Sequence, residues 1–468
     1  MKLLPSLLFS YSALVACSLP SVAALRESPT VKQVVMPAEV AKKVIIKGNL
    51  ISLVRNPFTG TYKGISMMKS RGEILGDPLL KYFPEVDAVY RDSHSIDDLL
   101  DDMGMPAPVP GNVEYLIDGK AFFTDITTAI EKAEKSVDTR VYIFDNDDVA
   151  AEFADLIKKK SKTVQCRVLM DELGSIGSWW ENPQTKMVQP DLGGGTIADY
   201  LTNGSRVKVR KSRNPWLVTD HSKLFVIDRK TAYLGGMNIG REYRYEWHDM
   251  MVKVTGPAVI SLQNEFNRAW RLQGGWGDWG IPFHHRYKHR EEIQKGEIGL
   301  RILQTKAGQN NIEKSILAAV RMSKKRVYLQ NPYFTSDALL RELLLARQRG
   351  VDIRMVFPEG NHSELLRIGN QTKAKQLVEA GARAYMYQTF SHIKAVVVDD
   401  WVCVGSANFD ALSFKINEEL NVAFSDKKAA DRLVRDLFIK DFETSKQLTR
   451  EDVKGWGNFV IENIVDQF

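Results

Sequence analysis

The chain has 468 residues, of which 44% are hydrophobic and 26% are charged. This composition is typical of a folded globular protein and excludes a largely disordered one. The formal net charge is +6, a mild excess that favours approach to anionic lipid or nucleic acid without identifying either. A chain of this length has room for roughly two to four domains.

The N-terminus has the layout of a secretion signal. A lysine precedes an apolar run over residues 3–15 that is too short to span a bilayer, and small residues follow it. Residues 14–17 resemble a lipoprotein box, which would place a lipid on Cys17, whereas residues 22–24 resemble an ordinary signal-peptidase site. An uncleaved anchor helix is the third interpretation. We expect residues 1–24 to be a signal peptide or lipoprotein leader, and the protein to be exported and associated with a periplasmic or cell-envelope membrane.

Cysteine and histidine usage bears on redox state and metals. Cys166 and Cys403 each lie in an apolar, strand-like run, which favours buried free thiols over a disulfide. No Cys-x-x-Cys spacing occurs, and the one His-x-x-x-His spacing, His285 to His289, lies in a basic linker run that is expected to be solvated. The sequence therefore predicts a chemistry that needs neither a metal nor a cofactor.

Residues 25–111 show weak periodicity and no motif, and residues 103–111, rich in proline and glycine, are expected to form a linker. After that point, β-rich runs alternate with helical patterns, as they do in an α/β sheet covered by helices.

An internal repeat organises the rest of the chain. In the first half the expected order is helix 121–136, strand 140–144, helix 149–160 and strand 165–170. The second half repeats it with helix 312–322, strand 326–330, a leucine-rich helix that ends at Gly350, and strand 351–357. We expect two similar halves, 112–290 and 291–468, joined by a linker near residues 284–294.

Each half contains a His-x-Lys motif with an aspartate at the same interval. The two sets are His221, Lys223 and Asp228, and His392, Lys394 and Asp399. An apolar run follows each lysine and predicts a buried strand, on which residues two apart face the same side. A glycine-containing loop follows each motif and can approach a ligand closely. We expect Gly236 and Asn238 in one loop, and Ser406 and Asn408 in the other, to bind a phosphate.

Two histidines and two lysines suit the cleavage of a phosphodiester. One neutral imidazole can attack phosphorus, and a second, protonated imidazole can give its proton to the leaving alkoxide. The lysines and asparagines can stabilise the charge that builds on the phosphoryl oxygens. Asp249 and Glu419 lie at the same offset after Asn238 and Asn408. They are candidates for holding each imidazole by its second nitrogen, although ordinary structural ion pairs are an equal alternative.

These residues resemble the phospholipase D superfamily, with its paired HxKxxxxD motifs and trailing G-[SG]-x-N loops. The resemblance covers about residues 115–448 and is closest to the bacterial cardiolipin synthases, through the segments 247–249, 331–334 and 405–410. It implies two phospholipase D-like repeats, each a mixed β-sheet flanked by helices, packed with pseudo-twofold symmetry around one active site that is complete in one chain. The second Asp-to-Gly interval is one residue shorter than the first, which we expect to trim a hairpin.

The resemblance also implies roles. The family's ping-pong reaction makes His221 the expected nucleophile and His392 the expected acid, while Asp228 and Asp399 are expected to hold the loop without touching substrate. The expected partners are a phospholipid, an alcohol or water acceptor, and a membrane surface. The alternative is a secreted metal-independent nuclease, for which nucleic acid would be the substrate. A phosphate-binding scaffold without turnover is a third hypothesis, and two intact motifs argue against it.

Basic and aromatic residues leave two further questions open. The basic run over residues 206–213 can gather anionic headgroups or a nucleic-acid backbone, or can simply be an exposed strand. Trp179, Trp180 and Trp216 can dip into a lipid interface or pack in a core, and for Trp270 core packing is the prediction.

Overall fold

The computed structural model describes residues 48–76, 93–175, 196–213, 216, 218–283, 286–288, 290, 292–360 and 364–457. The chain divides into two units, residues 1–46 and residues 47–468, and every described residue belongs to the second. The leader with Cys17, and Trp179 and Trp180, lie outside the described residues, so these predictions stay predictions. The same holds for the expected domain boundaries.

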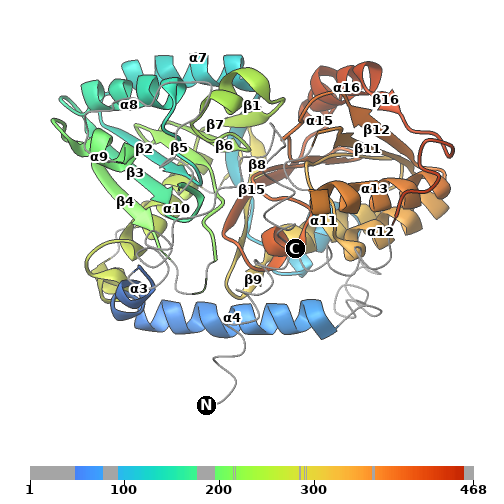
Figure 1. The fold of residues 1–468 in the computed structure, drawn as a ribbon, viewed down its shortest axis with the longest axis horizontal. Helices are drawn as coiled ribbons and strands as arrows, with labels where there is room; N and C mark the ends of the chain where they lie inside the picture. The colour runs from blue at the N-terminus through green and yellow to red at the C-terminus, as the bar shows by residue number, and fades with distance from the viewer. Residues whose placement is uncertain are drawn as a thin grey trace, which may run out of the picture. The chain divides into compact units, whose positions relative to one another are not determined.

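Within the described residues, one mixed sheet of 16 strands runs through both halves (Figure 1). The first half contributes β1 (Val109–Ile117), β2 (Ser136–Val141), β3 (Gln165–Asp171), β4 (Lys208–Ser212), β5 (Leu224–Ile227), β6 (Thr231–Gly235) and β7 (Met250–Thr255). The second contributes β8 (Ile298–Lys306), β10 (Arg326–Gln330), β11 (Asp352–Pro358), β12 (Arg383–Tyr387), β13 (Ala395–Val398), β14 (Trp401–Gly405) and β15 (Glu419–Ser425), with the short β9 (Gln309–Asn310) and β16 (Lys446–Gln447).

The strand order is nearly symmetric about the central pair β1 and β8. Outward from the centre the first half reads β7, β6, β5, β2, β3, β4, and the second reads β15, β14, β13, β10, β11, β12. The directions also match, because β2 pairs parallel with β3 and antiparallel with β5, as β10 does with β11 and β13. This confirms the expected α/β fold of two repeats related by pseudo-twofold symmetry.

Helices cover the sheet, and buried apolar side chains fill three clusters. The first half has α7 (Asp118–Glu131), α8 (Asp148–Lys160), α9 (Ile197–Thr202) and α10 (Ala258–Leu272), and the second has α11 (Asn311–Met322), α12 (Asp337–Gln348), α13 (Glu364–Glu379), α14 (Ala411–Lys415), α15 (Lys427–Leu433) and α16 (Ile439–Thr444). One cluster lies in each half, and the third combines side chains of both halves, among them Leu234, Phe266 and Val404. The shared core holds the repeats together and so fixes the two motifs relative to each other.

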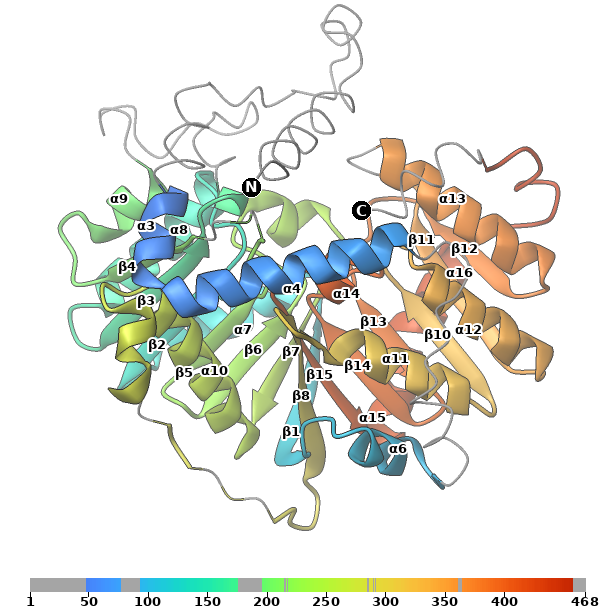
Figure 2. The same cartoon turned by 90° about the horizontal axis from the view of Figure 1, so that it is seen from below.

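Among the described residues, three helices precede the sheet: α3 (Gly48–Arg55), α4 (Pro57–Gly76) and α6 (Ile96–Asp102). Helix α4 runs across both halves (Figure 2), with contacts to the 3₁₀ segment η5 (Gly277–Phe283) of the first half and to α14 of the second. None of the described helices combines the length and the apolar character that crossing a bilayer requires.

Most expected elements are present, with two differences at the boundaries. Strand β2 starts at Ser136, whereas the sequence predicted helix up to that residue and strand only from residue 140. Because Ser136, Asp138 and Arg140 are polar, this part of the strand lacks an apolar sequence pattern. All three side chains are nevertheless buried in the fold. The expected linker at 103–111 is wrong at its end, because residues 109–111 belong to β1 and pair with β8.

Other expectations are confirmed directly. Cys166 and Cys403 are free and buried, and Trp270 is packed in the shared core. The turn between β13 and β14 has two residues where that between β5 and β6 has three, so the missing residue does shorten a hairpin.

Candidate active site

The two motif histidines lie just before equivalent strands, His221 before β5 and His392 before β13. Each is fixed by the backbone of the opposite half. The amide of His221 donates to the carbonyl oxygen of Glu418 at 2.9 Å, and the amide of His392 donates to that of His248 at 2.7 Å. Short bridges at Asp220–Glu418 and His248–Ser391 extend this contact. The site therefore lies where the repeats meet.

The predicted carboxylates pair with the imidazoles, and each carboxylate reaches across to the other half's ring. Nδ1 of His221 lies 3.0 and 3.1 Å from the two oxygens of Glu419, and Nδ1 of His392 lies 2.7 Å from Oδ2 of Asp249. A carboxylate on Nδ1 fixes the ring and directs its chemistry to Nε2. Sequence offset picked out both carboxylates, but only the tertiary structure gives the crossed pairing.

The two motif lysines are buried and belong to the same electrostatic cluster. Nζ of Lys223 donates to the carbonyl oxygen of His221 at 2.7 Å, and Nζ of Lys394 donates to that of His392 at 2.6 Å. Burial lowers the pKa of Lys223 to about 8, and burial together with the nearby Lys223 lowers the pKa of Lys394 to about 7. An anion between these ammonium groups would restore their charged form, so the cluster is suited to bind a phosphate.

The surroundings of His221, Glu419 and Asp249 shift their pKa values in different directions. Burial lowers the pKa of His221 and outweighs the opposing effect of Glu419, which favours a neutral imidazole at pH 7. Burial alone would raise the pKa of Glu419, but His221, Lys223 and the Ser406 hydroxyl lower it overall. Burial raises the pKa of Asp249 to about 7 despite the two lysines.

Asp228 and Asp399 hold loops, and their described contacts lie with backbone amides. Asp228 accepts from the amides of residues 134, 135 and 136 at 2.6–2.9 Å, and Asp399 accepts from those of 324, 325 and 326 at 2.8–3.0 Å. Both have a positive φ, 54° and 52°, in the turns that follow β5 and β13. For Asp228, hydrogen bonds outweigh the effect of burial and lower its pKa. These contacts agree with a supporting role.

Gly236 and Ser406 lie behind the carboxylates, and their phosphate-binding role stays a prediction. A Cβ on Gly236 would come within 2.2 Å of Oδ1 of Asp249, so only glycine leaves room for that carboxylate. The fully buried Ser406 donates its hydroxyl hydrogen to Oε2 of Glu419 at 2.5 Å, and the Ser406 hydroxyl oxygen accepts from the Leu420 amide at 3.0 Å. The single hydroxyl proton of Ser406 is thus already used, and both residues shape the carboxylates that hold the histidines.

The two asparagines are placed differently. Asn238 accepts from the Ile143 amide at 3.0 Å and donates to the Tyr243 hydroxyl at 2.8 Å, so it supports the loop. Asn408 is buried, and its Oδ1 has no hydrogen-bond partner among the described residues. The phosphate-binding role predicted for Asn238 and Asn408 stays a prediction.

A buried ion network, which no sequence pattern indicated, lies behind His221. Arg140 donates to both oxygens of Asp220 at 2.8 Å and pairs with Glu265 and Glu418. Lys63 of α4 also pairs with Glu418. These residues lie up to 355 positions apart in the chain, and no local pattern links them.

Aromatic rings pack against both imidazoles, a further feature that the motifs alone did not reveal. The Tyr142 ring is 4.8 Å from that of His221, and Nζ of Lys223 lies 5.2 Å from the centre of the Tyr142 ring. The Trp247 ring is 5.2 Å from that of His392. These contacts restrict ring motion and shield the site from water.

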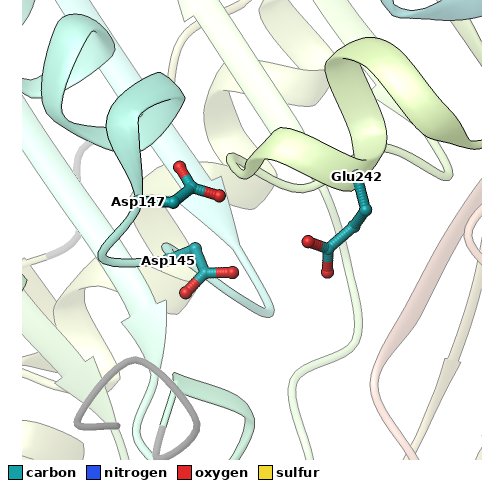
Figure 3. A group of neighbouring side chains, drawn as sticks. All are labelled: Asp145, Asp147 and Glu242. Carbon is teal, nitrogen blue, oxygen red and sulfur yellow. The ribbon is translucent and has the colours of Figure 1, made fainter. Parts of the chain in front are cut away.

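Three acidic residues lie together outside the His-Lys cluster (Figure 3). One oxygen from each of Asp145, Asp147 and Glu242 lies within 4.8 Å of the others. Burial and neighbouring carboxylates raise the pKa of Asp145 to about 6 and that of Glu242 to about 7. Asp147 already caps α8 and accepts from the Arg241 amide. The trio can be satisfied by protonation, so it does not by itself identify a metal site.

Comparison with known proteins relates the chain to a family. A family model described as "Cardiolipin synthase, PLD-like domain" matches residues 126–270 and 316–441. The chain is 31% identical over 367 residues to cardiolipin synthase A of Pseudomonas putida, with 74% of this chain and 72% of that protein covered. It is 29% identical to the major cardiolipin synthase ClsA of Bacillus subtilis, over 73% of this chain and 71% of that protein.

Among solved structures, the phosphatidylserine synthase of Haemophilus influenzae Rd KW20 superposes with a TM-score of 0.60. It is 14% identical, and the match covers 82% of this chain and 97% of that one. At this identity the likeness concerns the fold alone.

Proposed function

The chain belongs to the phospholipase D-like family of cardiolipin synthases and is a phospholipase D-type phosphatidyltransferase; from this premise we propose that it moves a phosphatidyl group from one phospholipid to an alcohol through a phosphohistidine on His221. The observation that carries the proposal is the crossed arrangement of two imidazoles, each on a carboxylate of the opposite half. It supplies one nucleophile and one acid to a single substrate.

In the first step, Nε2 of neutral His221 attacks phosphorus, and the bond from phosphorus to the headgroup oxygen breaks. His392 gives a proton to the departing alkoxide, so that a neutral alcohol leaves. Lys223 and Lys394 stabilise the charge on the phosphoryl oxygens in the five-coordinate transition state. Glu419 stabilises the positive charge that His221 acquires.

In the second step, His392 takes the proton from the hydroxyl of an acceptor, and the resulting oxygen attacks phosphorus. The bond to Nε2 of His221 breaks and the ring returns to its neutral form. An acceptor that is itself a phospholipid alcohol would give a cardiolipin-like product, and water would give hydrolysis. Trp247, Tyr243 and Phe390 surround the His392 ring and would help to exclude water, which favours transfer.

The test is to incubate purified protein in EDTA with phosphatidylglycerol alone, with phosphatidylcholine plus a short alcohol, or with single-stranded DNA, and to separate the products. We expect transfer from phosphatidylglycerol to continue in EDTA. DNA cleavage without lipid turnover would overturn the proposal in favour of the nuclease alternative, which the relatives do not favour. Loss of turnover in EDTA that Mg²⁺ or Zn²⁺ restores would contradict the metal-independent mechanism and direct attention to the acidic trio.

The roles of the two histidines are separated by their alanine variants. His221→Ala should abolish both turnover and the covalent intermediate, because no nucleophile remains. His392→Ala should lose roughly 100- to 10,000-fold in turnover, as expected for a lost general acid, but should still build up phosphohistidine slowly. Acid-quenched reactions with radiolabelled lipid measure the intermediate. An intermediate that persists in His221→Ala and vanishes in His392→Ala would reverse the assignment.

A further inference from the structure

Helices α3 and α4 present an apolar face to solvent. Val54, Phe58, Tyr62, Ile65 and Met68 have exposed fractions of 78%, 67%, 56%, 58% and 51%. They recur every three or four residues, so they lie on one side of the helical segment. A helix on the surface of a water-soluble protein ordinarily turns its polar side outward. This segment does the opposite.

The inner side of the same segment is small and polar, and polar contacts attach it to the rest of the protein. Asn56 donates to the carbonyl oxygen of Leu272 at 3.1 Å, and Gly60 accepts from the Trp216 ring nitrogen at 2.7 Å. Lys63 pairs with Glu418. Trp216 therefore packs beneath α4. From the sequence, insertion into a lipid interface and packing in a core were both open for this residue.

The exposed apolar face continues onto Trp276 and onto segment η5, which begins at the next residue. Trp276 and Trp279 have exposed fractions of 77% and 58%, and the Trp279 ring lies 5.6 Å from that of Phe58. Tryptophan is enriched at membrane surfaces because its ring is apolar and its N–H is polar. We call the outer side of α3 and α4, together with these two tryptophans, the docking face.

A basic cavity opens beside the docking face. It has a volume of about 600 Å³, and its lining includes Arg167, Arg210, Arg271 and Trp276. Burial and repulsion from neighbouring arginines lower the pKa of Arg210. Arg167 is neutralised by Asp138, whereas no acidic side chain pairs with Arg210 in the contacts of the described residues. An anion in the cavity would relieve this repulsion.

We propose that the docking face lies on the surface of an anionic lipid bilayer, with the basic cavity receiving a phosphate-bearing headgroup. Exposed aromatic and aliphatic side chains next to clustered arginines are the composition of an interfacial, non-spanning membrane contact. Charge favours a lipid over a second copy of this chain, because a twofold contact would bring two basic cavities together. Binding is measured without turnover, so the proposal stands or falls independently of the proposed function.

The first experiment compares vesicle flotation of two variants of the full chain, both carrying Cys17→Ser to remove the candidate lipid attachment. The test variant is F58Q/I65Q/M68Q, which replaces exposed side chains with helix-compatible polar ones. The control is L345Q, which changes an exposed apolar residue of α12. We expect the test variant to bind phosphatidylglycerol vesicles roughly tenfold or more weakly, from the lost apolar insertion, and the control to bind as the parent does. Equal binding of both would overturn the proposal.

The second experiment reports the position itself, so that binding through the N-terminal region cannot mimic the result. A nitrobenzoxadiazole label is attached to the new thiol of Ile65→Cys, or of Leu345→Cys as control, in the Cys17→Ser chain. On phosphatidylglycerol vesicles the label at 65 should shift to the blue and be quenched by lipid-borne spin labels, while the label at 345 should not. A label at 65 that stays in water on bound protein contradicts the proposal. So does one that is shielded without vesicles, whether by a second copy at high protein concentration or by the chain's own residues 1–47.

The headgroup cavity is tested by charge. Arg210→Gln should reduce the preference for phosphatidylglycerol over phosphatidylcholine vesicles several-fold, and the reduction should fade at high salt because screening weakens the attraction. Arg206→Gln is the matched control. It removes the same charge from an exposed position two residues before β4, the strand that carries Arg210. An equal effect of both variants would show a diffuse charge contribution and overturn the headgroup site, whatever the flotation result.

Discussion

The two halves hold their histidines at equivalent positions with different chemistry. Arg140 on β2 and Gln330 on β10 occupy the same register position, opposite Leu224 and Ala395. Each binds the residue before a motif histidine. In the first half this is an ion pair from Arg140 to Asp220, and in the second it is a hydrogen bond of 2.8 Å from Gln330 to the Ser391 hydroxyl.

The carboxylates differ as well. Glu419, which holds His221, accepts from Ser406 at 2.5 Å and from Ser413 at 2.8 Å, and its pKa is lowered. Asp249, which holds His392, packs on Gly236 instead, and burial raises its pKa to about 7. The duplicated scaffold thus keeps an ionised support behind one ring and a support that titrates near neutrality behind the other. This asymmetry fits a fixed nucleophile and a ring that exchanges protons.

The largest expected effect comes from neutralising the two supports. Glu419→Gln should lower kcat/KM on the order of 10²- to 10⁴-fold at all pH values, because the imidazole loses its charged partner. Asp249→Asn should cost less below pH 7, where Asp249 is already protonated in part, and more above it. The measurement is kcat/KM for lipid transfer between pH 5.5 and 8.5. Identical, parallel profiles for the two variants would remove the proposed asymmetry.

The ion network behind His221 should be costly to break. Arg140→Gln copies the second half's residue but leaves Asp220, Glu265 and Glu418 buried beside a neutral group, so the free energy of unfolding should fall by about 3–5 kcal/mol. Adding Asp220→Ser, which copies Ser391, should recover part of the loss. Gln330→Ala, the control in the other half, should cost about 1 kcal/mol for a neutral hydrogen bond. Urea unfolding measures all three, and an additive double variant would refute the coupling.

Because of His248, the free energy of unfolding should decrease as the pH rises into the alkaline range. It lies 2.6 Å from Asp118 and 3.0 Å from Asp441, and although burial alone would lower its pKa, these carboxylates raise it to about 9. A raised folded-state pKa contributes stability that is fully present below the unfolded value of about 6.5 and is lost as pH rises to about 9. The contribution at pH 6 is about 3 kcal/mol. In His248→Gln the unfolding free energy should vary less over this range, and an unchanged slope would contradict the assignment.

The smallest expected effect is at the loop aspartates. Asp228→Asn and Asp399→Asn should each cost about 1–2 kcal/mol, because a neutral amide oxygen accepts from backbone amides more weakly than a carboxylate does. For Asp228, whose folded-state pKa is lowered, the loss should begin to shrink below the unfolded value of about 3.9 and disappear once pH has fallen through the lowered folded-state pKa. Transfer activity at permissive temperature should change only a few-fold. A loss as large as that of Glu419→Gln would show that these residues touch the reaction.

The sequence by itself determined the repeat, the two motifs and the two candidate carboxylates. Identical intervals such as His221 to Asp228 and His392 to Asp399 are local, and apolar strands after each lysine fix which residues share a face. The same locality explains the misjudged start of β2. A strand with buried Asp138 and Arg140 has no apolar signature, since its polar groups are satisfied only by partners brought from elsewhere in the chain.

Tertiary structure alone decided how these pieces combine. The crossed pairing of His221 with Glu419 and of His392 with Asp249 depends on the shared core that packs the repeats against each other. The outward apolar face of α4 was likewise hidden in the sequence, because periodicity shows that a helix has two sides but not which side meets solvent. Long-range contacts, such as that of Lys63 with Glu418, set that orientation, and they follow from packing and not from local sequence.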